Sequence, residues 1–174
     1  GGAFRDMGVH VLDAAWSLLE FPQPVTVTGV SGARFGPLGK GYSHSVDRKT
    51  YRQFVADDYA GGFIRFEGGV GLQVESFWAS HQPGEVQIEL FGTEAGGTYQ
   101  PLKIYRTVDG GEQDIEVSLR RPTESWDNIA GHFIDCILGG KPCSAPLKHG
   151  LQVQVMMEAL LKSAQTGREV RIRG

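Results

Sequence analysis

The chain reads FIRFEGGVGLQVESF over residues 63–77, which is the clearest β pattern in its 174 residues. Apolar and polar residues alternate on both sides of Glu67–Gly68–Gly69, as in two antiparallel strands joined by a glycine turn. One set is expected to face a core, namely Val70, Leu72 and Val74. The other set faces away from it, namely Arg65, Gln73, Glu75 and Phe77. An open face that mixes polar and aromatic residues is typical of a subunit interface, so we expect a homo-oligomer assembled through it.

The hairpin is flanked by further strands and by helices. Alternation predicts strands over 25–34, 86–91, 102–108, 115–119 and 169–173, with another after the turn at 94–97. A period of 3.6 predicts helices over 6–20, from 123–125 to 139, and over 147–165. Residues 35–51 show no clean period and are expected to form a long loop. The predicted order is one helix, many strands mostly joined by hairpins, two helices and a final strand. This order predicts an α+β fold, with an open, largely antiparallel mixed sheet and helices packed on one face.

The composition excludes several classes of partner. The formal net charge is −3 and no basic run occurs, which argues against nucleic acid or an anionic membrane surface. No apolar segment is long enough to span a bilayer, and we expect a cytoplasmic location. The two cysteines, Cys136 and Cys143, form no C-x-x-C pair, so neither a zinc site nor a disulfide framework is predicted. We expect reduced thiols, with Cys136 in the core.

The common nucleotide and hydrolase motifs are absent from the sequence. Neither G-x-G-x-x-G nor G-x-x-x-x-G-K-[ST] occurs, although the chain has 25 glycines. Neither a G-x-S-x-G elbow nor an H-E-x-x-H pair is present. This chain alone is therefore not expected to bind a dinucleotide in the usual way.

The first predicted helix carries its polar side chains on one stripe. At about 100° per residue, Asp6, His10 and Asp13 lie close together on the helical wheel. Such a stripe is the ordinary exposed face of a helix. It is also suited to acid–base chemistry, because carboxylates favour the protonated imidazole and hold one tautomer. A metal-dependent enzyme that uses these three residues is a third reading, without support from a cysteine or a further histidine.

The segment GGAFRDMGVHVLD, residues 1–13, resembles the G-G-x-x-x-D-x-G-x-H-x-x-D signature of the Gfo/Idh/MocA oxidoreductases. The likeness continues in order along nearly the whole chain, at 24–29, 57–69, 91–93, 132–140 and 151–170. This resemblance implies a fold like the C-terminal domain of glyceraldehyde-3-phosphate dehydrogenase. It also implies that residues 1–174 are the substrate-binding and catalytic C-terminal domain of a larger enzyme.

In that family an N-terminal Rossmann domain, absent from this chain, binds NAD or NADP and supplies a lysine from an E-K-P motif. The resemblance implies an NAD(P)-dependent dehydrogenase that interconverts a hydroxyl and a ketone on a sugar, cyclitol or related polyol. This chain by itself is then expected to be inactive. The alternative is a non-catalytic oligomerisation or sugar-binding domain.

The resemblance also assigns roles within the first helix. His10 would be the catalytic acid/base and Asp6 its supporting carboxylate. Asp13 matches the last aspartate of the signature. The alternative to a substrate contact for Asp13 is a role in anchoring the helix. The expected substrate contacts, chosen by residue type and position, are Arg5, Asp13, Lys40, His44, Arg48 and Trp78.

Overall fold

The structure, a computed structural model, describes residues 1–40, 48–82, 84–118 and 126–172. It divides the chain into two compact units, of which the first is Gly1–Gly84 with Lys148–Gly174 and the second is Glu85–Leu147. Among the described residues, no helix is both long and apolar enough to cross a bilayer.

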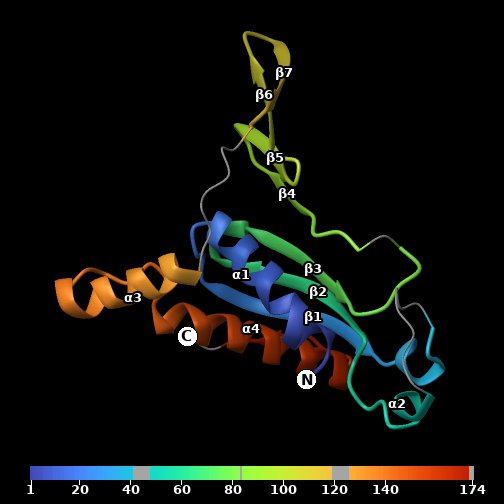
Figure 1. The fold of residues 1–174 in the computed structure, drawn as a ribbon. Helices are drawn as coiled ribbons and strands as arrows, with labels where there is room; N and C mark the ends of the chain where they lie inside the picture. The colour runs from blue at the N-terminus through green and yellow to red at the C-terminus, as the bar shows by residue number, and fades with distance from the viewer. Residues whose placement is uncertain (41–47, 83, 119–125, 173–174) are drawn as a thin grey trace. The chain divides into compact units, whose positions relative to one another are not determined.

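The first unit is a four-stranded antiparallel sheet with two main helices (Figure 1). Its strand order is β3-β2-β1-β8. Its elements are η1 (Phe4–Gly8, a π-helical turn), α1 (Val9–Leu18), β1 (Pro24–Gly32), η2 (Gly36–Leu38), α2 (Arg48–Arg52), β2 (Tyr59–Phe66), η3 (Glu67–Gly69), β3 (Gly71–Phe77), α4 (Leu147–Thr166) and β8 (Val170–Arg171).

The second unit contains a separate four-stranded antiparallel sheet and one helix. The strands follow one another as a meander, in the order β4-β5-β6-β7. Its elements are β4 (Ile88–Phe91), β5 (Ala95–Tyr99), β6 (Lys103–Val108), β7 (Gly111–Glu116) and α3 (Trp126–Gly139).

The core of the first unit lies between one face of its sheet and the helices α1 and α4. Alternate residues of each strand point to this face because the side-chain period of a strand is two. On α4, Leu160 packs against the sheet at Gly29 and Gly62. The buried side chains of this cluster are Phe4, Leu12, Trp16, Val27, Ala60, Ile64, Phe66, Val74, Val153, Met156, Met157, Ala159, Leu160 and Leu161.

The helices α1 and α4 pack on one face of the sheet. We call the opposite face the open face. It consists of Thr28, Val30, Tyr59, Phe63, Arg65, Gln73, Glu75 and Phe77. Arg65 lies over the ring of Phe63, with 5.4 Å between its guanidinium carbon and the ring centroid. Tyr59 and Phe77 are cross-strand partners whose rings stack at 6.0 Å. The predicted outward set is therefore confirmed.

The α+β class, the antiparallel pairing and the helices on one face are confirmed, but the described strands form two sheets instead of one. In the part of the chain that the structure describes, no ladder joins β3, which ends at Phe77, to β4, which begins at Ile88. The residue Val70 precedes β3 and is exposed, so its predicted place in the core is wrong.

Three further expectations need correction. The first helix begins two residues before Asp6, with a π-helical turn. The predicted loop 35–51 contains two short helical segments, η2 and the start of α2. Cys136 is only half-buried and lies outside the core, on α3.

At Gly62 both the neighbouring strand β1 and the helix α4 come close to β2, and this position tests the packing. A Cβ at Gly62 would collide with the carbonyl oxygen of Thr28 and lie 3.0 Å from Leu160. We expect Gly62→Ala to lower the free energy of unfolding by about 1–3 kcal/mol, because backbone cannot move aside cheaply. Thermal or urea unfolding measures this change.

The matched control is Gly150→Ala within α4, where a Cβ meets nothing within 4 Å. An alanine in an open helical position is expected to raise the stability by about 0.5–1 kcal/mol. Equal effects of the two substitutions would contradict the packing of α4 on the sheet.

Candidate active site

The segment with Asp6 is held in place by two glycines of the first 13 residues. Gly2 has φ +123°, and a Cβ there would collide with the Asp57 carboxylate. At Gly8, a Cβ would collide with the ring of Phe4, which is fully buried. Only glycine leaves room for both contacts. The two glycines thus let the π-helical turn approach the sheet closely.

The N-terminal end of this helix is fixed by residues from β3 and from the lead into β2. The Ala3 N–H donates to the Asp57 carbonyl at 2.9 Å, and the Phe4 N–H lies 3.5 Å from the Asp57 carboxylate. The buried Ser76 hydroxyl donates to the Ala3 carbonyl at 3.1 Å. A carboxylate beside the first amides of a helix also suits the helix dipole. The start of the helix is therefore anchored to both strands.

Trp78 connects the end of β3 to the Asp6 side chain. Its indole N–H donates to Asp6 Oδ2 at 2.9 Å. The indole ring meets Phe54 edge-on with centroids 6.4 Å apart, and the Trp78 backbone N–H donates to the Asp58 carbonyl. Trp78 follows Ser76 by two residues, and both side chains reach the first helix, as expected on one face of a strand. The carboxylate of Asp6 is thus oriented by a fixed donor.

His10 lies one turn beyond Asp6, and its side chain is exposed. Asp13 is also exposed, one turn further along α1. The exposed imidazole is accessible to a ligand, and its neighbour Asp6 is a carboxylate whose orientation Trp78 fixes. A π-helical turn at such a point is often found at functional sites. This arrangement can accept and return a proton beside a bound hydroxyl group.

Asp58 is a fully buried carboxylate that organises the neighbouring loop. It accepts hydrogen bonds from the backbone N–H groups of Arg34, Phe35 and Gly36, at 2.9, 2.8 and 2.6 Å to Oδ2. Its own N–H donates to the Gly32 carbonyl. Three successive amides compensate the buried charge, which would otherwise be costly. This carboxylate fixes the chain that leaves β1.

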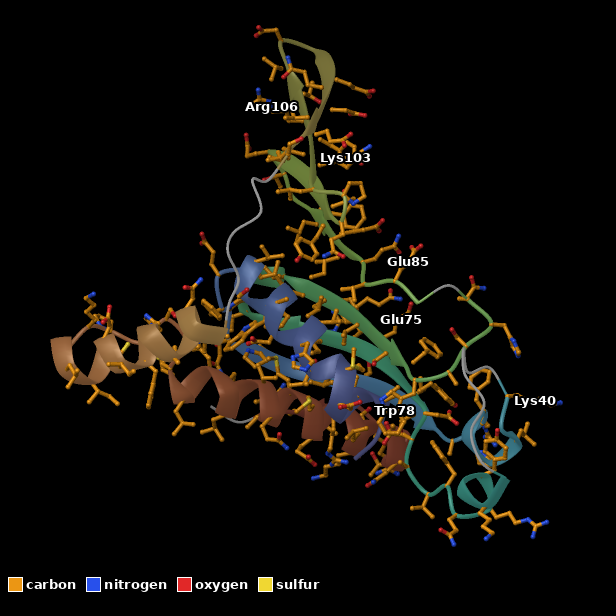
Figure 2. The ribbon with its side chains drawn as sticks, viewed as in Figure 1. Lys40, Glu75, Trp78, Glu85, Lys103 and Arg106 are labelled. Atoms are coloured by element: carbon orange, nitrogen blue, oxygen red, sulfur yellow. The ribbon has the colours of Figure 1, made fainter. Side chains whose placement is uncertain are left out.

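Among the remaining predicted contacts, the structure describes the side chains of Arg5 and Lys40. The Arg5 guanidinium forms an ion pair with Glu158 of α4 at 2.8 Å, which holds η1 against that helix. Lys40 is exposed and points outward, away from Trp78 (Figure 2). His44 lies outside the described residues. Arg48 begins α2, but its side chain is not described.

A second group of polar side chains occurs on α3 and the segment after it. Among the described residues, His132, Cys136 and Cys143 are the one set whose ligand atoms lie within 4.8 Å of one another. Partial burial, followed by the nearby Cys143, raises the pKa of the Cys136 thiol above its usual 9.0. The three residues Asp6, His10 and Asp13 do not form such a set, so the metal-dependent reading of the first helix gains no support from the geometry.

Sequence reasoning did not assign roles to Asp57, Asp58 or Ser76. The doublet Asp57–Asp58 directly before β2 was the available signal, because paired acids at a strand entrance often bond to backbone amides. No local pattern indicates that Ser76 reaches the Ala3 carbonyl, which is 73 residues away.

A family model described as "Oxidoreductase family, C-terminal alpha/beta domain" matches residues 1–172. D-glucoside 3-dehydrogenase from Escherichia coli (strain K12) is 30% identical over 177 residues, covering 99% of this chain and 49% of that protein. The chain therefore spans about half the length of this curated relative.

Solved structures resemble the fold over the same extent. Aldose-aldose oxidoreductase from Caulobacter crescentus, complexed with glycerol, matches with a TM-score of 0.73 and 22% identity, over 99% of this chain and 48% of that one. Levoglucosan dehydrogenase, complexed with NADH and levoglucosan, matches with a TM-score of 0.72 and 21% identity, over 100% and 51%. At these identities the similarity establishes the fold alone.

The Asp58 carboxylate gives a direct test of the site's framework. We expect Asp58→Ala to lower the free energy of unfolding by roughly 1–3 kcal/mol, because three backbone amides, one of them buried, lose their acceptor. Asp58→Asn keeps one carbonyl oxygen and should lose less. Chemical unfolding measures both, with the exposed Asp114→Ala on β7 as the matched control. A loss in Asp58→Ala no larger than in that control would contradict the assignment.

Proposed function

The chain belongs to the Gfo/Idh/MocA family of oxidoreductases, and on that basis we propose that it is the substrate-binding and catalytic C-terminal domain of an NAD(P)-dependent dehydrogenase. The observation that carries the proposal is the oriented Asp6 carboxylate, held by Trp78 in a π-helical turn, with exposed His10 one turn away. The rest of the proposed enzyme, including a Rossmann domain, belongs to the N-terminal part of a longer protein.

In this proposal His10 takes the proton of the substrate hydroxyl during oxidation and returns it during reduction. Asp6, one helical turn before His10, is the proposed supporting carboxylate. Trp78 keeps the Asp6 carboxylate from rotating away, because its indole N–H donates a hydrogen bond to Asp6 Oδ2. Arg5 is left out of the substrate contacts, since its guanidinium already binds the Glu158 carboxylate.

This chain does not itself offer the usual site for a dinucleotide. Its described strands pair antiparallel, and the sequence has no glycine-rich phosphate loop between a strand and a helix. We therefore place NAD or NADP mainly on the N-terminal domain. A nicotinamide, when bound, accepts or gives the hydride, and the proton is left to His10.

The proposed substrate is a sugar, cyclitol or related polyol. The relatives and structural neighbours support this class, because they include a glucoside dehydrogenase and a dehydrogenase in complex with levoglucosan. Lys40, His44 and Arg48 stay predicted contacts, as do Trp78 and Asp13. The cytoplasmic location expected from composition also stays a prediction.

The catalytic assignment is tested in the full-length protein that contains this chain, assayed against a panel of sugars and polyols. We expect His10→Ala to lower kcat/KM by roughly 10²- to 10⁴-fold, the usual contribution of a general acid or base. Asp6→Ala should also lower it, and Asp6→Asn less, since the amide oxygen can still accept from Trp78.

Ser17→Ala is the matched control, because Ser17 is exposed on α1 and donates only to the Ala14 carbonyl. An unchanged kcat/KM in both His10→Ala and Asp6→Ala would refute the assignment. A dinucleotide titration of the same protein distinguishes the enzyme from a non-catalytic sugar-binding or assembly domain.

We also propose that the open face joins copies of the chain. Val30 is 63% exposed and Phe77 is 47% exposed, on a sheet face with a hollow of about 540 Å³ between its side chains. Isolated exposed apolar residues are ordinary, but a row across three paired strands is typical of an interface. The face offers aromatic rings and one cation, which suits a self-complementary contact.

Substitution of Phe77 by aspartate tests this interface. A charge on this face should shift the molar mass of the full-length protein toward that of the monomer, as measured by light scattering. Val55→Asp is the matched control, since Val55 is 96% exposed and lies before β2, off the sheet. A wild-type protein that is monomeric, or a Phe77→Asp variant of unchanged mass, would contradict the proposal.

A further inference from the structure

We propose that His132, Cys136 and Cys143 form a binding site for a thiophilic cation of the zinc class. The three ligand atoms lie within 4.8 Å of one another, all inside the second unit. One imidazole nitrogen and two thiolates are the donors that borderline-soft divalent ions prefer. The inference is independent of the proposed dehydrogenase function, because it concerns a different helix.

Helical spacing brings the first two ligands together. His132 and Cys136 are four residues apart on α3, so they share one face. Their ligand atoms, His132 Nε2 and Cys136 Sγ, lie 3.5 Å apart. For Zn–N and Zn–S bonds of about 2.05 and 2.3 Å, the edge of a tetrahedron is about 3.6 Å. These two ligands therefore have the separation that one tetrahedral ion requires.

The third ligand arrives because the chain reverses after the helix. α3 ends at Gly139, and Gly140 takes φ +63°, a conformation that terminates helices and turns the chain back. Lys141 then forms an ion pair with Asp135 of α3 at 2.9 Å. That contact links the returning segment to the helix, and Cys143 follows Lys141 by two residues.

The imidazole is in the tautomer that a metal needs. The Ser144 backbone N–H donates to His132 Nε2 at 3.1 Å, so this nitrogen carries a lone pair. The Ser144 hydroxyl lies 3.0 Å from the same atom. An incoming ion replaces these two contacts, and the exposed Ser144 amide can then bond to water. The fourth position of the ion is left to water beside the Ser144 hydroxyl.

The charge and access of the group agree with this assignment. Two thiolates and a neutral imidazole balance a divalent cation, and the bound thiols release their protons. His132 and Cys136 are half-buried, while Cys143 is exposed and leaves an entry path. A bound ion would link the segment after α3 to the helix, in addition to the ion pair between Lys141 and Asp135.

The test uses the full-length protein under a phosphine reductant, with Zn²⁺ titrated against a chromogenic chelator. We expect one equivalent of Zn²⁺ to bind. Each of the substitutions Cys136→Ser, Cys143→Ser and His132→Gln should weaken Zn²⁺ binding by more than roughly 10- to 100-fold, which is the usual effect of removing a residue that only supports a metal ligand. His81→Gln, an exposed histidine in the first unit, is the matched control and should bind like the wild type.

Two readouts separate a built site from loose thiol binding. Co²⁺ in place of Zn²⁺ should give a thiolate charge-transfer band that each cysteine substitution weakens, and Zn²⁺ should slow amide exchange over 139–147. Wild-type affinity in either serine variant would overturn the site. So would the failure of the reduced wild-type protein to bind one equivalent.

Discussion

The first unit depends on the hydrogen bonds that the buried Asp58 carboxylate accepts from backbone amides. A buried charge is tolerated only where donors surround it, and here the amides of Arg34, Phe35 and Gly36 supply them. The backbone of Asp58 extends this junction, because it bonds to the Gly32 carbonyl and accepts from the Trp78 N–H. The ends of β1, β2 and β3 therefore meet at one residue, and the preceding aspartate holds the first helix beside them.

Much of this unit could be predicted from the sequence, because its causes are local. Alternation over 63–77 reports which side chains face the core, and Ile64 and Val74 are buried as a strand of period two requires. The helical stripe of Asp6, His10 and Asp13 follows in the same way from spacing. The resemblance of residues 1–13 to a family signature is what favours a site over an ordinary exposed face, which spacing alone could not do.

The rest depends on contacts between distant residues, which leave little local signal. The hydrogen bond from Trp78 to Asp6 spans 72 residues, and only residue type and position suggested that Trp78 lies near the site. Within the π-helical turn the Phe4 ring lies against Gly8, where a Cβ would collide with it, and helical periodicity does not report such a packing contact. Cys143 comes close to His132 and Cys136 only because the chain reverses after α3. The spacing of these three residues in the sequence therefore does not match a familiar metal-binding motif.

The strand β3 shows how one element serves both proposed roles of the unit. Ser76 and Trp78 reach the first helix, whereas Glu75 and Phe77 belong to the open face. A strand is stiff along its length and its residues alternate strictly, so the two sets are fixed by the same backbone. Assembly through the open face would therefore restrain the strand that orients Asp6, without any subunit contact at the site itself. On this reading, burial of Phe77 and the orientation of Asp6 are linked through three consecutive residues.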